Sequence, residues 1–345
     1  MVGSIKRKER IMTKRIEYID ALRGFNMILI VMLHVFICSY HANTETFNWH
    51  SYFSLFNLPL FFFISGFVFY RKDRLWNIHF FLKFIMEKTR ILLLPTLVFF
   101  SSYSYIFGLN FVKEICTDLK SGYWFTIVLF CFFTIYAIIM TVFRVTKLVM
   151  IILLILSILL LWSTKPVIYD LVNPNLISIG KLRYFIFFLL GVFVKNHFNN
   201  FERLLVNRWT MTFLIPFFFI SVILLFHSFM PETLKFVLWG SSGLIIVFGL
   251  FRHYEKSFAK ESIIGYCLQY IGTRTLDVYL LHYFFLPQNL HEAGQFFNES
   301  LNPTIELFVT LLLALLIICL CLILSNVIRL SPLLAHWLFG AKSTK

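Results

Sequence analysis

Two side chains in the first apolar segment of the chain, Arg23 and His34, are of types that could take part in chemistry. They lie in DALRGFNMILIVMLHVFICSYH, residues 20–41, a run long and apolar enough to span a bilayer as a helix. Their separation of eleven residues corresponds to about 1100°, about 20° beyond three full turns, so both are predicted on one helix face. The helical rise places them about 16 Å apart, roughly half the thickness of the hydrocarbon core.

His34 is therefore predicted near the membrane midplane. An imidazole at that depth is costly unless it faces a polar cavity or a partner, which makes it a candidate functional residue. Its protonation changes near neutral pH, which suits it to proton transfer. The alternative is that His34 only hydrogen-bonds a neighbouring helix and holds it in place.

A second group of polar residues lies in IGTRTLDVYLLHYFFLP, residues 271–287. Asp277 is the only acidic residue expected inside a span, and Arg274, three residues earlier, is within reach of it on a helix. Tyr279 and His282 follow on the same segment. A structural pair between Arg274 and Asp277 fits the sequence at least as well as a catalytic one.

Two shorter motifs mark the second and third apolar segments. In FFFISGFVF, Ser65 and Gly66 form a small pair that allows another helix to approach closely. In TRILLLP, Arg90 opens the third segment and Pro95 is expected to kink it. Arg90 either extends towards lipid phosphates or faces inward and binds an anionic ligand.

The composition identifies a polytopic membrane protein. The chain has 345 residues, 59% hydrophobic and 14% charged, whereas soluble domains have about 25% charged residues. The net charge of +14 comes from basic residues at helix ends rather than from one patch, so no nucleic-acid partner is expected. The six cysteines lie mostly in apolar segments without metal-ligand spacing, and neither disulfides nor a metal site are expected.

The apolar segments predict an all-α membrane bundle of about ten transmembrane helices with both termini cytoplasmic. With an inside N-terminus, 23 lysines and arginines fall in inner segments and six in outer loops, as the positive-inside rule requires. Residues 71–90 read as an amphipathic helix on the inner surface. The expected spans are 21–40, 52–70, 91–109, 122–143, 148–163, 182–195, 209–229, 233–251, 266–287 and 304–328.

The chain is expected to form one membrane domain, residues 20–330. A basic cytoplasmic arm, residues 1–19, precedes it, and a short cytoplasmic tail, residues 331–345, follows it. No soluble domain is expected at either end, so the chemistry is expected in or at the membrane. Acidic membrane lipids would attract the arm.

These motifs resemble those of the membrane-bound acyltransferase-3 family, over essentially the whole chain. The likeness rests on IDALRGFNMILIVMLH, FFFISGFVF, TRILLLP and TLDVYLLH, in the family's order and spacing. The resemblance implies an acyl-CoA donor, namely acetyl-CoA, on the cytoplasmic side. It also implies that His34 is catalytic and that Arg23 and Asp20 help to build the donor entrance.

The same resemblance suggests roles for four more residues. Arg90 would contribute with Arg23 to a cationic mouth for the phosphates of CoA. Ser65, Tyr279 and His282 would line the substrate cavity. His34 would act as a general base on an acceptor hydroxyl, or would itself carry the acyl group across the membrane. Many relatives carry an additional soluble esterase-like domain, which is not seen here.

The function expected from residues and resemblance together is O-acetylation of a cell-surface glycan or its lipid-linked precursor in a bacterial inner membrane. A different acyl group, such as succinyl, or a lipid or small-molecule acceptor would fit the same fold. A transporter of glycan precursors is the alternative from another class, although no inverted repeat is evident. A homo-oligomer and a partner protein are both compatible with the sequence.

Overall fold

A computed structural model describes residues 16–41, 49–71, 74–143, 146–162, 179–225, 230–300 and 303–341, and every element in these ranges is a helix. The predicted all-helical class is therefore confirmed. Residues 1–15 of the basic arm lie outside the described residues. The first part of the chain forms α2 (Glu17–His34), η1 (Val35–Ser39), α3 (Trp49–Phe69), α4 (Ile78–Lys88), η2 (Thr89–Leu93), α5 (Leu94–Ile106), α6 (Phe111–Ile115), η3 (Lys120–Gly122), α7 (Trp124–Phe143) and α8 (Thr146–Trp162).

The second part of the chain continues the helical pattern after the undescribed residues 163–178. It forms η5 (Ile179–Tyr184), α9 (Phe185–Asn196), α10 (Phe198–Val206), α11 (Arg208–Leu225), α12 (Glu232–His253), α13 (Ile263–Thr273), α14 (Thr275–Phe285), α15 (His291–Ser300), α16 (Pro303–Arg329) and α17 (Pro332–Phe339).

Five helical segments are long and apolar enough to cross a membrane. They are Glu17–Ser39, Trp49–Phe69, Trp124–Phe143, Glu232–His253 and Pro303–Arg329. Two shorter apolar helices cover Leu148–Leu159 and Trp209–Leu224. The chain thus has the helices of a membrane protein, whereas the count of ten spans and the side of the termini stay predictions.

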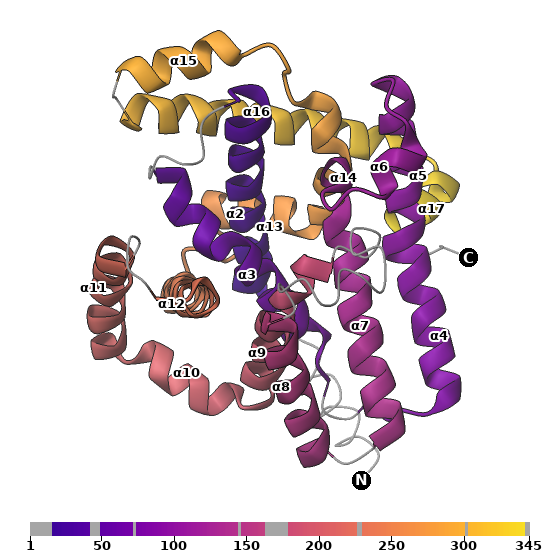
Figure 1. Ribbon diagram of the computed structural model, residues 1–345, viewed down its shortest axis with the longest axis vertical. Helices are drawn as coiled ribbons and strands as arrows, with labels where there is room; N and C mark the ends of the chain where they lie inside the picture. The colour runs from indigo at the N-terminus through magenta and orange to yellow at the C-terminus, as the bar shows by residue number, and fades with distance from the viewer. Residues whose placement is uncertain are drawn as a thin grey trace.

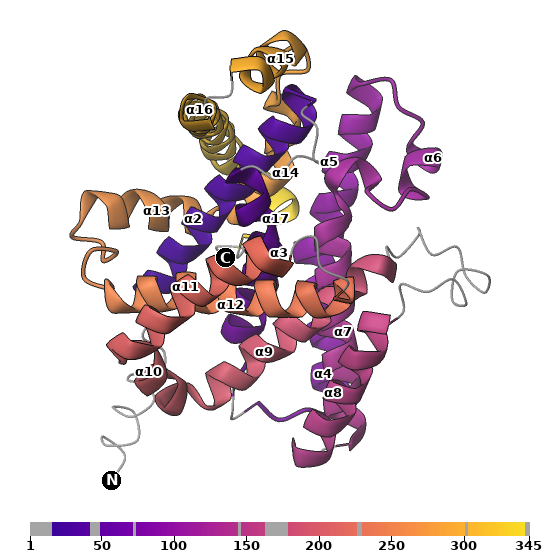
Figure 2. The same cartoon turned by 60° about the vertical axis from the view of Figure 1, so that its left-hand side comes forward.

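The long helices do not run in one common direction. In Figure 1, α16 lies across the top of the molecule, α7 runs almost vertically and α12 is viewed along its axis. In Figure 2, α12 lies across the view and α16 is seen nearly end-on. Helix α2 packs against α3, α12, α13, α14 and α16, and most of its side chains are buried.

Close backbone contacts explain how α2 and α3 approach their neighbours. A Cβ atom on Gly66 would lie 2.0 Å from the carbonyl oxygen of Phe188 in α9, so the close approach predicted for this small pair is confirmed. On α2, a Cβ atom on Gly24 would lie 1.9 Å from the carbonyl oxygen of Leu268 in α13. Any larger side chain at either glycine would push the two helices apart.

Three segments differ from their predicted form. The predicted span 266–287 is two helices, α13 and α14, which are separated at Arg274. Helix α4 continues through the π-helical η2 into α5, so the amphipathic segment and the start of the third predicted span form one unbroken helical run (Figure 1). Its position on the inner surface stays a prediction. Part of the predicted tail, 331–345, forms α17, which packs against α5 and η2.

Candidate active site

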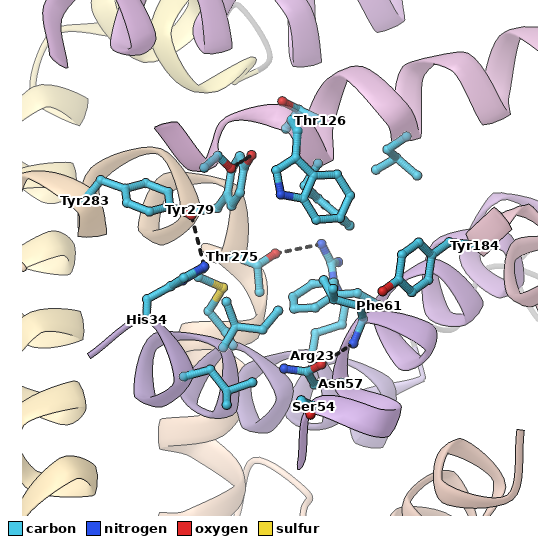
Figure 3. Close-up of a pocket in the computed structure, with 18 of the residues that line it drawn as sticks. Arg23, His34, Ser54, Asn57, Phe61, Thr126, Tyr184, Thr275, Tyr279 and Tyr283 are labelled. Carbon is cyan, nitrogen blue, oxygen red and sulfur yellow. Dashed lines mark hydrogen bonds between the residues drawn. The ribbon is translucent and has the colours of Figure 1, made fainter. Parts of the chain in front are cut away.

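A cavity of about 400 Å³ lies between α2, α3, η2, the start of α7, and α14. Arg23 and His34 both line it, which confirms that they share one face of α2 (Figure 3). The predicted residues Ser65 and Tyr279 line it as well. The other polar or aromatic residues of the wall are Phe36, His50, Ser51, Ser54, Asn57, Phe61, Trp124, Phe125, Thr126, Tyr184, Thr275 and Tyr283.

Arg23 connects α2 to the first residue of α14. Its Nη2 atom donates a hydrogen bond to Oγ1 of Thr275 at 3.0 Å (Figure 3). Its Nη1 atom lies 3.9 Å from Oδ1 of Asp20, whose side chain is buried behind it. One third of the Arg23 side chain remains exposed, so a positive charge is available to a ligand at this end of the cavity. Asp20 does not line the cavity and acts through Arg23.

His34 is hydrogen-bonded to two residues of α14. Its Nδ1 atom lies 3.0 Å from Nε2 of His282, and its Nε2 atom lies 3.1 Å from the hydroxyl of Tyr283. The two imidazole rings are stacked with centroids 4.9 Å apart. His282 is fully buried behind His34 rather than in the cavity wall.

The main chain of α14 determines which nitrogens of this pair carry hydrogen. Nδ1 of His282 lies 3.1 Å from the carbonyl oxygen of Val278 and 2.8 Å from that of Tyr279. Because carbonyl oxygens only accept, this nitrogen donates, and Nε2 of a neutral His282 must accept from Nδ1 of His34. Nε2 of His34 then carries a lone pair, which accepts the Tyr283 hydroxyl. That lone pair is what a general base or a nucleophile requires.

A tight turn supports the tyrosines of α14. The hydroxyl of Tyr279 donates to the carbonyl oxygen of Gly122 at 2.9 Å. Gly122 has φ +94°, and a Cβ atom there would lie 2.0 Å from Cζ of Tyr283. The next residue, Tyr123, donates its hydroxyl to the carbonyl oxygen of Leu280 at 3.0 Å. Glycine at position 122 is therefore needed both for its backbone conformation and for the position of Tyr283.

The structure does not bring Arg90 to the cavity. Its Nη1 atom lies 2.9 Å from Nε2 of His336 in α17. Leu92, two residues further along the chain, lines the cavity wall instead. Nδ1 of His336 donates to the carbonyl oxygen of Ala341, so Nε2 is free to accept from Arg90. Arg90 thus bonds η2 to α17. Because it does not line the cavity, its position does not support the predicted contact with the donor.

The expected pair between Arg274 and Asp277 is not formed. Asp277, 2% exposed, accepts hydrogen bonds from Nε and Nη2 of Arg329 at 2.9 Å each and from Oγ of Ser325 at 2.5 Å. Arg274 instead donates to Oδ1 of Asn326 at 2.8 Å. The i, i+3 geometry fails because Arg274 lies between α13 and α14 with φ −115° and ψ 19°.

Several residues of the site were not singled out by the sequence. Trp124, His50, Thr275 and Tyr283 were not among the predicted site residues, yet all four line the cavity. Tyr283 adjoins His282, and the run of polar and aromatic residues in this segment is the one signal that could have drawn attention to it. No group of His, Cys, Asp or Glu within the described ranges gathers as metal ligands.

The fold and site together define a helical membrane protein with an imidazole and an arginine on one cavity. A family model described as an acyltransferase domain matches residues 16–329. The chain therefore belongs to the acyltransferase-3 family, as its motifs predict, and membrane acyltransferase activity is the activity this family suggests. Comparisons with curated proteins and with solved structures gave no match.

Proposed function

We propose that this protein transfers an acetyl group from cytoplasmic acetyl-CoA to a hydroxyl of a cell-surface glycan or its lipid-linked precursor, with His34 as the residue that acts on the hydroxyl. The proposal includes ten spans with both termini in the cytoplasm of a bacterium and residence in its inner membrane. The observation that carries it is the hydrogen-bond network that leaves Nε2 of His34 as an acceptor in a cavity that also contains Arg23.

The charge of Arg23 and its distance from His34 support a CoA thioester as donor. Arg23 offers a cation for the phosphates of CoA, and guanidinium groups bind phosphate with two hydrogen bonds. His34 lies eleven residues further along α2, about 16 Å in helical rise, which the extended pantetheine arm of CoA can cover. The thioester would then meet the imidazole inside the protein, away from bulk water.

In the direct reaction, an acceptor hydroxyl takes the place of the Tyr283 hydroxyl at Nε2 of His34. Its oxygen attacks the thioester carbonyl carbon while its proton passes to Nε2. The C–S bond then breaks, an ester remains on the acceptor, and His34 returns the proton to the departing CoA sulfur. The displaced Tyr283 hydroxyl is placed to donate a hydrogen bond to the oxyanion that forms.

A relay through His34 would use the same nitrogen. Nε2 would attack the thioester carbonyl carbon, the C–S bond would break, and CoA would leave as its thiolate. In a second step the acceptor oxygen would attack the acyl carbon, the C–N bond would break, and the hydroxyl proton would neutralise the thiolate. Rapid acid-free quenching of protein mixed with [¹⁴C]acetyl-CoA, without acceptor, distinguishes the two. Label bound to the protein through His34 supports the relay, and its absence supports direct transfer.

The test of the function uses membranes that contain the wild type, His34→Ala or His253→Ala. His253 is an exposed histidine at the end of α12 and serves as the control. With [¹⁴C]acetyl-CoA, the wild type and His253→Ala should label extracted saccharide or lipid-linked saccharide, and His34→Ala should lose at least about 10²-fold in rate. Equal labelling by His34→Ala, at equal protein in the membrane, would overturn the assignment.

A further inference from the structure

The cavity has a second polar end, formed by His50, Ser51 and Ser54 in the first turns of α3. His50 is 3% exposed, and its Nε2 atom has no hydrogen-bond partner among the described residues. A buried polar atom without a partner is uncommon because it has lost its water without a replacement. This nitrogen belongs to a residue that lines the cavity, so a ligand in the cavity is the natural partner.

The His50 ring is held by one ring from another element and by one from its own helix. It stacks on Phe36 of η1 with ring centroids 3.8 Å apart and an interplanar angle of 27°. The neighbouring indole of Trp49 packs edge-on against it and donates from Nε1 to Oε2 of Glu306 in α16 at 3.1 Å. The imidazole is thus fixed by packing on both sides, which is what a binding residue needs and an exposed surface histidine lacks.

His50, on α3, and Arg23, on α2, lie at different levels along the axis of α2. Phe36, on which His50 stacks, follows Arg23 by 13 residues, about 20 Å of helical rise, and His34 lies between them. Among the described lining residues, Arg23 carries the only permanent charge. The end with Arg23 favours an anionic molecule, whereas the end with His50 offers uncharged donors and acceptors.

We infer that His50, with Ser51 and Ser54, forms a binding site for an uncharged polyhydroxylated acceptor. This acceptor occupies the end of the cavity remote from Arg23 and presents one hydroxyl to His34. A neutral imidazole both donates and accepts. The Ser54 hydroxyl donates to the carbonyl oxygen of Ser51 at 2.7 Å and keeps lone pairs that accept, so this end of the cavity matches the hydroxyls of a neutral sugar. Donor and acceptor therefore meet at His34 from opposite ends. The inference rests on the proposed function.

The test uses purified protein in liposomes, [¹⁴C]acetyl-CoA and two probes, octyl β-glucoside and octyl β-glucuronide, below their micellar concentrations. The two differ only in that C6 of the glucuronide is a carboxylate. The wild type is expected to acetylate the glucoside with the lower KM. Preference for the glucuronide, or no transfer to the glucoside by protein that still labels membrane extracts, would overturn the inference.

Two substitutions then separate the hydrogen bond from the packing of the ring. His50→Phe keeps the stacking on Phe36 and removes Nε2, and it should raise the KM for the glucoside about tenfold with the KM for acetyl-CoA unchanged. His50→Gln places an amide near the position of Nε2 and should recover most of the loss, and His253→Ala should match the wild type. An unchanged KM for the glucoside in His50→Phe would overturn the inference.

Failure of this inference and failure of the proposed function give different results. If the wild type transfers no label to extracts or to either glycoside, the function itself is wrong. If transfer is His34-dependent but indifferent to His50→Phe, only the assignment of this end of the cavity is wrong.

Discussion

Nδ1 of His34 lies 3.0 Å from Nε2 of His282, and the hydrogen bond between them is oriented by the main chain of α14. The pair joins residues 248 positions apart in the sequence. It turns Nε2 of His34 towards the cavity as a hydrogen-bond acceptor. His282 thus orients the imidazole of His34, and the face of α14 that contacts α2 carries the residues that bond to it.

The first prediction concerns His282. In His282→Phe the Nδ1 hydrogen of His34 loses its acceptor, so either tautomer becomes accessible and kcat should fall about 10²-fold while both KM values change little. His282→Gln supplies an amide oxygen as a new acceptor and should recover part of the rate. Steady-state kinetics in liposomes measure both. A kcat for His282→Phe equal to that of the wild type would show that the pair has no catalytic consequence.

The second prediction concerns Gly122. Alanine there would place a Cβ atom 2.0 Å from Cζ of Tyr283 in a backbone conformation with φ +94°. Gly122→Ala should therefore displace Tyr283 and reduce transfer at least about tenfold. Gly108→Ala is the matched control, because Gly108 has φ +65° and nothing within 4 Å of the added Cβ. If both variants lose the same activity, backbone strain rather than the position of Tyr283 is responsible.

The third prediction concerns the ion pair that holds α14 to α16. Arg329→Gln leaves the buried carboxylate of Asp277 with Ser325 as its remaining partner, which should destabilise the protein by about 3–5 kcal/mol. The thermal unfolding temperature of the purified protein should fall accordingly. Arg274→Gln removes an arginine near in sequence to Asp277 but bonded to Asn326, and should cost less than about 1 kcal/mol. Equal losses would contradict the observed pairing.

The fourth prediction concerns the donor. Arg23→Ala should raise the KM for acetyl-CoA about tenfold or more, and Arg23→Lys should raise it less, because lysine keeps the charge but not the two-pronged geometry. The KM for S-acetylpantetheine, which lacks the nucleotide phosphates, should change little in either variant. If Arg23→Ala impairs both donors equally, Arg23 supports the fold through Thr275 rather than binding phosphate.

The sequence predicted what depends on a single helix. The period of α2 placed Arg23 and His34 on one face, and the small pair at Ser65 and Gly66 indicated a close helix contact, which α9 makes. Such features follow from local geometry and residue size, which a sequence displays directly.

Features that depend on two distant segments were not predictable in the same way. The partner of Asp277 is Arg329, 52 residues further along the chain. The i, i+3 spacing predicted Arg274 instead, because the sequence does not show that the helix is interrupted at Arg274. His50 and Trp124 were not predicted as site residues, because only the packing of α2, α3 and α7 makes them part of the cavity wall. The direction of Arg90 was open in the sequence, and its bond to His336 decides it.

The carbonyl oxygens of Val278 and Tyr279 orient the His282 imidazole by accepting the hydrogen of Nδ1. In water-soluble enzymes a carboxylate often has this role. An amide carbonyl is a dipole without net charge, so the imidazole pair needs no ionised companion in a region where hydrocarbon surrounds the protein. A helix presents these oxygens whatever its side chains are. The residue at position 278 could therefore be exchanged for many others without losing the orienting carbonyl groups, whereas a substitution that unwinds α14 would remove them.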